Sequence, residues 1–230
     1  INQAIAKGVD PKVQIKDTGI EWLGEIPEHW EVMKLKYVTK IFRGKFSHRP
    51  RNDERLYNGI YPFFQTGDVA KADKILSSYS QTLNELGLNV STLFTKGTIV
   101  MTIAANIGDV AILGIDGCFP DSIVGFEPND RIQKEYLFHL LKNMKDEFIN
   151  SAIKNTQLNL NIERISTSII ALPPLREQLE ISNYIDVRTT EIINIINKTQ
   201  QEIELLKEYK TALISEVVTG KVDVRNEKLN

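Results

Sequence analysis

The sequence contains a single cysteine, Cys118, which excludes an internal disulfide. Proteins without disulfides are typical of reducing compartments, so we expect this protein in the cytoplasm. The three histidines have no metal-ligand spacing, and with one cysteine a zinc site is not expected. Hydrophobic runs are short, and none approaches the roughly 18–20 residues that a membrane-spanning helix needs. The composition therefore predicts an ordinary globular protein that has neither a structural metal nor a membrane anchor.

Sequence signatures of catalysis are also lacking. No glycine-rich loop of the dinucleotide or P-loop type precedes a predicted helix. The Asn-Pro-Pro-aromatic tetrapeptide of adenine methyltransferases is absent, since Pro173-Pro174 follows Leu172 instead. Pro120-Asp121 resembles the start of a nuclease motif, but no Glu-X-Lys follows at short range. We therefore expect a protein that is not an enzyme and carries no cofactor of its own.

Positive charge is not in excess overall, because 28 Lys and Arg face 30 Asp and Glu for a net charge of −2. It is nevertheless concentrated in one segment. Residues 34–55 carry a net charge of +6, which leaves −8 for the rest of the chain. A basic segment on an acidic background predicts a local binding surface for an anionic partner. Its basic residues are Lys34, Lys36, Lys40, Arg43, Lys45, Arg49, Arg51 and Arg55.

The first three quarters of the sequence predict a mixed α+β domain. Short runs rich in β-branched and aromatic residues, separated by glycine and proline, predict strands within 60–64, 98–103, 110–113 and 123–126. Apolar residues at helical spacing predict one helix over 134–153, with Asp130 as its N-cap. The aromatic residues Trp22, Trp30, Phe63 and Phe64, like Cys118, are interpreted as core residues.

The segment 175–219 contains neither proline nor glycine and predicts one long helix that ends near Gly220. About 45 residues at a rise of about 1.5 Å make a rod of roughly 65 Å, longer than a typical domain is wide. Such a rod needs a second helix, so we predict an antiparallel coiled coil; a helix folded back in two pieces is the alternative. The apolar residues fit a spacing of fours and threes in which Thr189, Thr199 and Lys210 take the weaker positions. The predicted pairing residues are Ile185, Ile192, Ile196, Ile203, Leu206, Leu213 and Val217.

The first eleven residues repeat a pattern from the end of the chain. Residues 1–11 align with 214–224 with three identities and with apolar residues in matching places. The second copy closes the long predicted helix, so the first is interpreted as the end of an equivalent helix from a preceding unit. We therefore expect the chain to be one unit of a two-unit protein. The expected organisation is a helix end and linker (1–19), a globular domain (20–172), a long helix (173–220) and a tail (221–230).

Five segments, taken together, resemble the specificity (S) subunits of type I restriction–modification systems. The first, Trp22–Val32, is similar to the opening of a target recognition domain in that family. Two interior segments are similar to landmarks of the same domain, and the last two are similar to its junction with the spacer helix and to the end of that helix. These four are Phe64–Val69, Ile107–Ile112, Ile169–Gln178 and Leu213–Val224.

The resemblance implies sequence-specific recognition of double-stranded DNA. In this family two target recognition domains each read one half of a split target, and antiparallel helices set their spacing and dock methyltransferase (M) subunits. Restriction (R) subunits are implied as further partners, and any S-adenosylmethionine or ATP requirement belongs to these partners. This sequence holds one domain and one full helix, so it is either half of a longer subunit or a half-length subunit that forms a homodimer through the long helix.

The residues that would read DNA are predicted from their chemistry. Phosphates require positive charge, and base edges require forked or amide side chains. The loop 43–52 offers both, and its candidates are Lys45, Ser47, His48, Arg49 and Arg51. Second candidates after a predicted strand are Gln65, Thr66 and Lys71. An amide-rich stretch adds Asn155, Gln157 and Asn159.

Two other functions stay open at this point. One is an assembly protein that pairs through its helix and does not bind DNA. The other is a stand-alone methyltransferase or nuclease. Substitution of Arg49 and Arg51 separates the DNA reader from the assembly protein, and a cofactor-binding or cleavage assay detects the enzyme.

Overall fold

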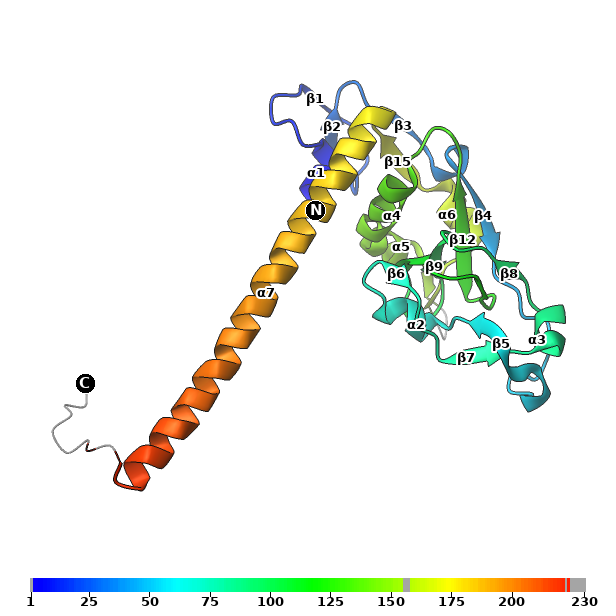
Figure 1. The fold of residues 1–230 in the computed structure, drawn as a ribbon. Helices are drawn as coiled ribbons and strands as arrows, with labels where there is room; N and C mark the ends of the chain where they lie inside the picture. Colours follow the sequence, from blue (N-terminus) through cyan, green and yellow to red (C-terminus); the bar gives the residue numbers. More distant parts are fainter. Residues whose placement is uncertain (1, 155–157, 222, 224–230) are drawn as a thin grey trace. The chain divides into compact units, whose positions relative to one another are not determined.

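The computed structural model describes residues 2–154, 158–221 and 223. The chain forms two compact units, Ile1–Asn183 and Tyr184–Asn230, which are described separately below. The first unit mixes helices and strands, and the second continues the long helix α7 (Leu175–Val218) (Figure 1). The predicted α+β fold followed by one long helix is confirmed.

A five-stranded sheet forms the centre of the first unit. Three of its strands are buried on both faces, which explains their continuous apolar sequences. All neighbours pair antiparallel except the last two, which are parallel. In spatial order the strands are β4 (Thr39–Arg43), β12 (Ile123–Pro128), β9 (Ile99–Thr102), β10 (Val110–Leu113) and β6 (Ile75–Leu76).

A second, four-stranded sheet carries the segments that matter below. Its long strand β5 pairs antiparallel with β7 and parallel with β11. The order is β7 (Gln81–Leu83), β5 (Tyr57–Phe63), β11 (Gly117–Cys118) and β8 (Leu93–Phe94). Adjacent residues at the end of β5 serve two different cores: Phe63 packs with Cys118 and Leu83, whereas Phe64 packs with Val100 and Phe119. This sheet is thereby fixed on both of its sides.

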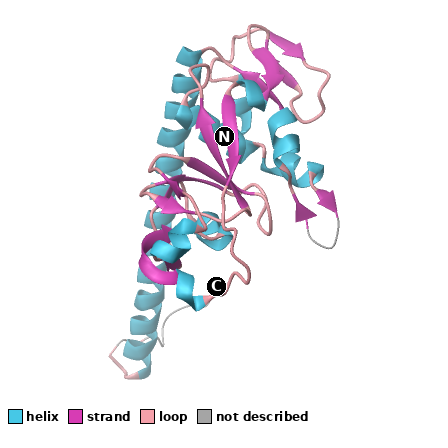
Figure 2. Cartoon of the chain, turned by 90° about the vertical axis from the view of Figure 1, so that its right-hand side faces the viewer, coloured by secondary structure: helices cyan, strands magenta, loops and turns pink. Residues whose placement is uncertain are grey.

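Short helices and two-stranded pairs complete the unit (Figure 2). The helices are α1 (Asn2–Lys7), α2 (Thr66–Lys71), α3 (Glu85–Asn89), α4 (Lys134–Asn143), α5 (Lys145–Ser151) and α6 (Ile162–Thr167), with 3-10 turns at Leu35–Tyr37 and Glu54–Leu56. The strand pairs are β1 (Ile15–Asp17) with β2 (Glu25–Pro27), β3 (Glu31–Lys34) with β15 (Ile169–Leu172), and β13 (Ile153–Lys154) with β14 (Leu158–Asn159). Helix α1 ends at Gly8, whose φ is 76°, and β1 lies within the linker predicted to follow it.

The predicted strands are confirmed, but the single helix over 134–153 is wrong. It is divided at Met144, whose ψ of 5° departs from helical geometry, and its second part ends at Ser151. Asp130 does not cap it either. Gln133 is the N-cap, and its backbone N–H donates to Oε1 of Gln178 at 2.7 Å, a partner 45 residues away.

Helix α7 runs unbroken for 44 residues, so the alternative of a helix folded back in two pieces is wrong. Gly220 ends it at a φ of 74°. The N–H groups of Gly220 and Lys221 donate to Val217 and Glu216, the two bonds of a Schellman motif. Within Tyr184–Asn230 the helix leaves large apolar side chains exposed, which is expensive in water unless a partner covers them. They include Ile192, Ile193, Ile195, Ile196, Ile203, Leu206, Leu213 and Ile214.

Candidate nucleic-acid interface

The basic loop predicted to read DNA follows β4 and is anchored through its backbone. The N–H of Lys45 donates to Phe119 O at 3.0 Å, and the N–H of Ser47 donates to Val90 O at 2.9 Å. Gly44 permits the first contact, because a Cβ there would lie 2.3 Å from the carbonyl oxygen of Pro120. The side chains of Lys45 and Ser47 are exposed. The backbone is thus anchored at Lys45 and Ser47, whose side chains face solvent.

Two arginines of the loop share one carboxylate that lies far away in the sequence. Arg49 is 3.5 Å from Asp121, and Arg51 forms a closer ion pair with the other oxygen of the same carboxylate. Arg49 also donates to the carbonyl oxygens of Phe46 and His48, at 2.8 Å each. Both guanidinium groups are about half exposed. Asp121 therefore aligns the two cations and partly neutralises them.

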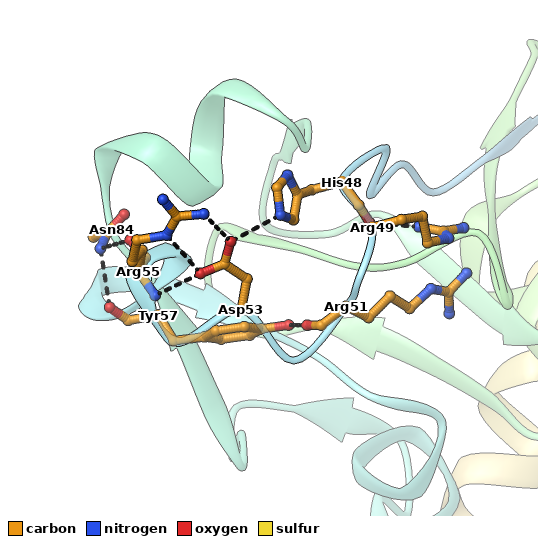
Figure 3. Close-up of polar contacts among 7 residues, drawn as sticks. All are labelled: His48, Arg49, Arg51, Asp53, Arg55, Tyr57 and Asn84. Atoms are coloured by element: carbon orange, nitrogen blue, oxygen red, sulfur yellow. Dashed lines mark hydrogen bonds and ion pairs between the residues drawn. The ribbon is translucent and has the colours of Figure 1, made fainter.

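A second carboxylate organises the other end of the loop (Figure 3). Asp53 accepts hydrogen bonds from Nε and a terminal nitrogen of Arg55, at 2.9 and 2.7 Å, and from the Arg55 backbone N–H at 3.2 Å. His48 Nε2 lies 2.9 Å from the same carboxylate. The Arg55 guanidinium beside Asp53 holds the pKa of that carboxyl well below its usual value. The same hydrogen bond raises the pKa of Arg55. Asp53 therefore stays ionised at neutral pH and keeps both partners in fixed positions.

Strand β5 contains a large bulge next to this loop. Tyr57 and Tyr61 both lie opposite Leu83 of β7, so residues 58–60 are extra on β5. Asn58 adopts a φ of 62°, a left-handed conformation that asparagine tolerates better than most residues. Asn84 stabilises the bulge, since its Nδ2 donates to the carbonyl oxygens of Arg55 and Tyr57 at 3.0 Å each. Tyr57 in turn donates its hydroxyl to Arg51 O, which ties β5 to the basic loop.

Gly59 lies where the bulge approaches Asn84, and this contact is testable. A Cβ at Gly59 would lie 2.3 Å from the Asn84 Cα and 2.5 Å from the Leu83 oxygen. We therefore expect Gly59→Ala to lower the free energy of unfolding by about 1–3 kcal/mol in urea denaturation, as overpacking does. Gly67→Ala is the control, since a Cβ there meets nothing within 4 Å and α2 favours alanine. Equal stability of the two variants would contradict this close packing.

Between the basic loop and β5 lies a concavity of about 400 Å³. Its apolar part consists of aromatic rings, and its polar part offers one guanidinium, one carboxylate and several amides. The lining residues are Phe46, Arg51, Asn52, Glu54, Tyr57, Asn58, Phe63, Gln65, Gln81 and Pro120. Gln65 donates from Nε2 to Oε1 of Gln81 at 3.1 Å, which orders both amides. Amides and guanidinium groups are the side chains that hydrogen-bond base edges most specifically.

Comparison with known proteins identifies the family. The model of the type I restriction modification DNA specificity domain matches residues 27–205. The chain belongs to this family. The specificity subunit of the type I restriction enzyme MjaVIII from Methanocaldococcus jannaschii is 28% identical over 197 residues, which are 84% of this chain and 43% of the relative. The chain thus spans about half the length of the curated relatives it matches.

Solved structures show the same fold. The HsdS subunit from Thermoanaerobacter tengcongensis superposes with a TM-score of 0.64 at 19% identity, covering 90% of this chain and 48% of that one. A chain from a structure on complex assembly and conformational transition of the type I R-M system gives a TM-score of 0.67 at 20% identity. That match covers 83% of this chain and 46% of that one.

Two of the segments that resemble the family, Trp22–Val32 and Ile169–Gln178, meet where the domain joins α7. Glu177, in the first turn of α7, contacts His29 at 2.7 Å and accepts a hydrogen bond from Trp30 Nε1 at 2.9 Å. Gln178 is fully buried and donates to the carbonyl oxygens of Pro173 and Arg131. The Leu-Pro-Pro-Leu-Arg-Glu-Gln segment of this specificity domain therefore fastens the start of its helix to Trp30 and to the start of α4.

The predicted DNA-reading residues fall into three groups. Lys45, Ser47, His48, Arg49 and Arg51 share the basic loop, and Gln65 joins Arg51 at the concavity. Thr66 and Lys71 lie at the two ends of α2, outside the residues that line the concavity. Asn155 and Gln157 lie outside the described residues, and Asn159 belongs to β14. The role of all these residues stays a prediction.

Several residues at this site were not among the candidates. Arg55 was counted in the basic segment, but nothing in the sequence indicated its pairing with Asp53. Asn52, Asn58 and Gln81 line the concavity with Arg51. A sequence signal existed only for Asn52, which follows Arg51 in the loop. Gln81 is brought there by the pairing of β5 with β7.

The part of the chain that the structure describes also bears on metal binding, membrane insertion and the single cysteine. It contains no group of three or more His, Cys, Asp or Glu side chains arranged to hold a metal ion. None of its helices is long and apolar enough to cross a bilayer. Cys118 is buried beside Phe63, and burial raises the pKa of its thiol, in agreement with its interpretation as a packed core residue.

Proposed function

We propose that this chain is a non-catalytic reader of double-stranded DNA within a type I restriction–modification complex. Membership of the specificity family carries the proposal. It is supported by a basic loop with exposed side chains next to an amide-lined concavity. In this proposal the domain 20–172 reads one half of a split target. Arginine and lysine in the loop contact phosphates, and the amides contact base edges.

The same proposal assigns partners to the rest of the chain. The apolar stripe of α7 pairs with a second, antiparallel helix, either from a preceding unit (with residues 1–19 as its end) or from a second copy in a homodimer. The paired helices dock methyltransferase subunits, and restriction subunits join that complex. Catalysis and cofactors belong to these partners. The complex works on cellular DNA, which in a bacterium or archaeon is cytoplasmic.

The proposal is tested by removing the two loop arginines together. In the complex with methyltransferase subunits, Arg49→Ala/Arg51→Ala is expected to weaken binding to the target duplex by about 10–100-fold at about 0.1 M salt. The slope of log affinity against log salt is expected to become shallower by about 2, one unit for each lost phosphate contact. Fluorescence anisotropy over a series of salt concentrations measures both quantities.

The control removes two arginines elsewhere. Arg131 and Arg176 are exposed and pair with Glu31 and Glu180, so Arg131→Ala/Arg176→Ala changes the net charge by the same amount. This control is expected to leave the affinity within about twofold. Unchanged affinity of the Arg49/Arg51 variant would overturn DNA reading by this loop and favour the assembly protein.

A further inference from the structure

Ile60 is the most exposed large apolar side chain among the described residues, at 81%. Isolated exposed apolar side chains are common and usually need no explanation. Ile60 differs because it lies within β5, in the middle of the four-stranded sheet. A strand residue is normally covered on one face, so the bulge directs this side chain into solvent.

The backbone around Ile60 is held on both sides. Asn58 precedes it in the left-handed conformation, and Gly59 packs against Asn84 with no space for a Cβ. Tyr61 follows it and donates its hydroxyl to Glu85 at 2.6 Å. Ile60 is therefore presented by an ordered segment. Binding a ligand there costs little conformational entropy.

The surroundings indicate what kind of ligand fits. Ile60 is two residues from Asn58 on β5, both are exposed, and Asn58 lines the concavity together with Arg51 and Asn52. Hydrogen-bonding groups therefore lie a short distance along the chain from one apolar side chain. Along the strand, the neighbours of Ile60 are Gly59 and Tyr61, whose hydroxyl is bonded to Glu85. In the major groove, thymine presents a single methyl group next to hydrogen-bonding atoms.

We propose that Ile60 contacts the C5-methyl group of one thymine and thereby fixes a T·A pair in the target. This inference rests on the proposed function and adds one specific base to it. The amides that line the concavity would bind the polar edges of the adjoining bases, and Arg51 would bind a phosphate. The bulge would keep the Ile60 side chain at a fixed position relative to these bases.

The test uses the complex with methyltransferase subunits and its target duplex, with each thymine replaced in turn by uracil, which lacks the methyl group. Wild type is expected to lose about fourfold in affinity at one thymine, the effect of one methyl-sized group leaving an apolar contact. Ile60→Ala is expected to bind the unmodified duplex about tenfold more weakly. It is also expected to be indifferent to uracil at that position.

Ile75→Ala is the matched control, since Ile75 is 55% exposed but lies on β6 of the other sheet. It should keep the wild-type sensitivity to uracil. Equal uracil sensitivity of wild type and Ile60→Ala, or no sensitive thymine at all, would overturn the inference. A third contradicting result is a rise in the fluorescence of 2-aminopurine placed in the duplex that occurs with wild type but not with Ile60→Ala. Such a rise indicates that Ile60 inserts between bases and unstacks them instead of contacting a methyl group. If only the thymine contact fails, Arg49→Ala/Arg51→Ala still weakens binding in the same assay, and the proposed function stays intact. If neither this variant nor Ile60→Ala changes the affinity, the thymine contact and DNA reading by the loop are both overturned.

Discussion

Gln178→Ala is expected to lower the free energy of unfolding by about 3–5 kcal/mol, the largest effect of any single substitution proposed here. The amide is fully buried and makes three hydrogen bonds to main-chain groups. Each buried backbone group that loses its partner costs about 1–3 kcal/mol. Urea denaturation followed by tryptophan fluorescence measures the change, because Trp30 is buried in the same junction.

Two further variants separate the hydrogen bonds from the loss of volume. Gln178→Glu keeps the shape but removes the donors that bind Pro173 O and Arg131 O. It is expected to be destabilised at neutral pH and to recover part of the loss in acid, where the carboxyl is protonated and can donate again. Gln200→Ala on the exposed part of α7 should change stability by less than about 0.5 kcal/mol. A loss below about 1 kcal/mol in Gln178→Ala would contradict this account of the junction.

Ile196→Asp/Ile203→Asp is expected to abolish pairing of the long helix. Both side chains are exposed within Tyr184–Asn230, at 59% and 41%, and lie on one face at helical spacing. Covering an isoleucine contributes about 1.5–3 kcal/mol, and a carboxylate at the same place must be desolvated instead. We expect the association constant to fall at least about a thousandfold. Sedimentation should detect self-association of the wild-type chain and a monomer for the variant.

The control places the same charges on the opposite face of the helix. Gln201→Asp/Leu205→Asp adds two carboxylates that also lie together on one helix face, and Leu205 is 64% exposed. At about 100° per residue, both positions lie roughly opposite Ile192. This variant should associate like wild type. Equal disruption by both variants would contradict pairing through the predicted stripe. A monomeric wild-type chain would contradict pairing with a second copy and leave the helix of a preceding unit as the partner.

Elements with a strong local signal were predictable from the sequence. The strands β9, β10 and β12 are continuous apolar runs, and α7 lacks any residue that breaks a helix. The division of the helix at Met144 was not predictable, because its apolar spacing continues across the break. Its N-cap was missed for a different reason. The partner of the Gln133 N–H is Gln178, which only the folded chain brings near.

The candidate site was predictable as a basic loop but not as a geometry. Lys45, Arg49 and Arg51 were predictable from local composition, and their side chains are exposed. The local composition contained no information on Asp121, which is 70 residues from Arg51 in the sequence and partly cancels its charge. The bulge of β5 was equally hidden, because it depends on the register with β7. Long-range pairing, rather than local preference, decides these features.

Under the proposed function, the backbone anchoring of the basic loop bears on how its contacts with DNA can change. Lys45 and Ser47 are tied down through their own N–H groups, which every residue except proline possesses. Apart from one hydrogen bond from the Ser47 hydroxyl to Val90 O at 3.2 Å, their side chains take no part in this anchoring, so we expect the loop to keep its shape when they are exchanged. Under the proposed function, substitutions at these two positions can therefore change the contacts with DNA while the fold stays intact.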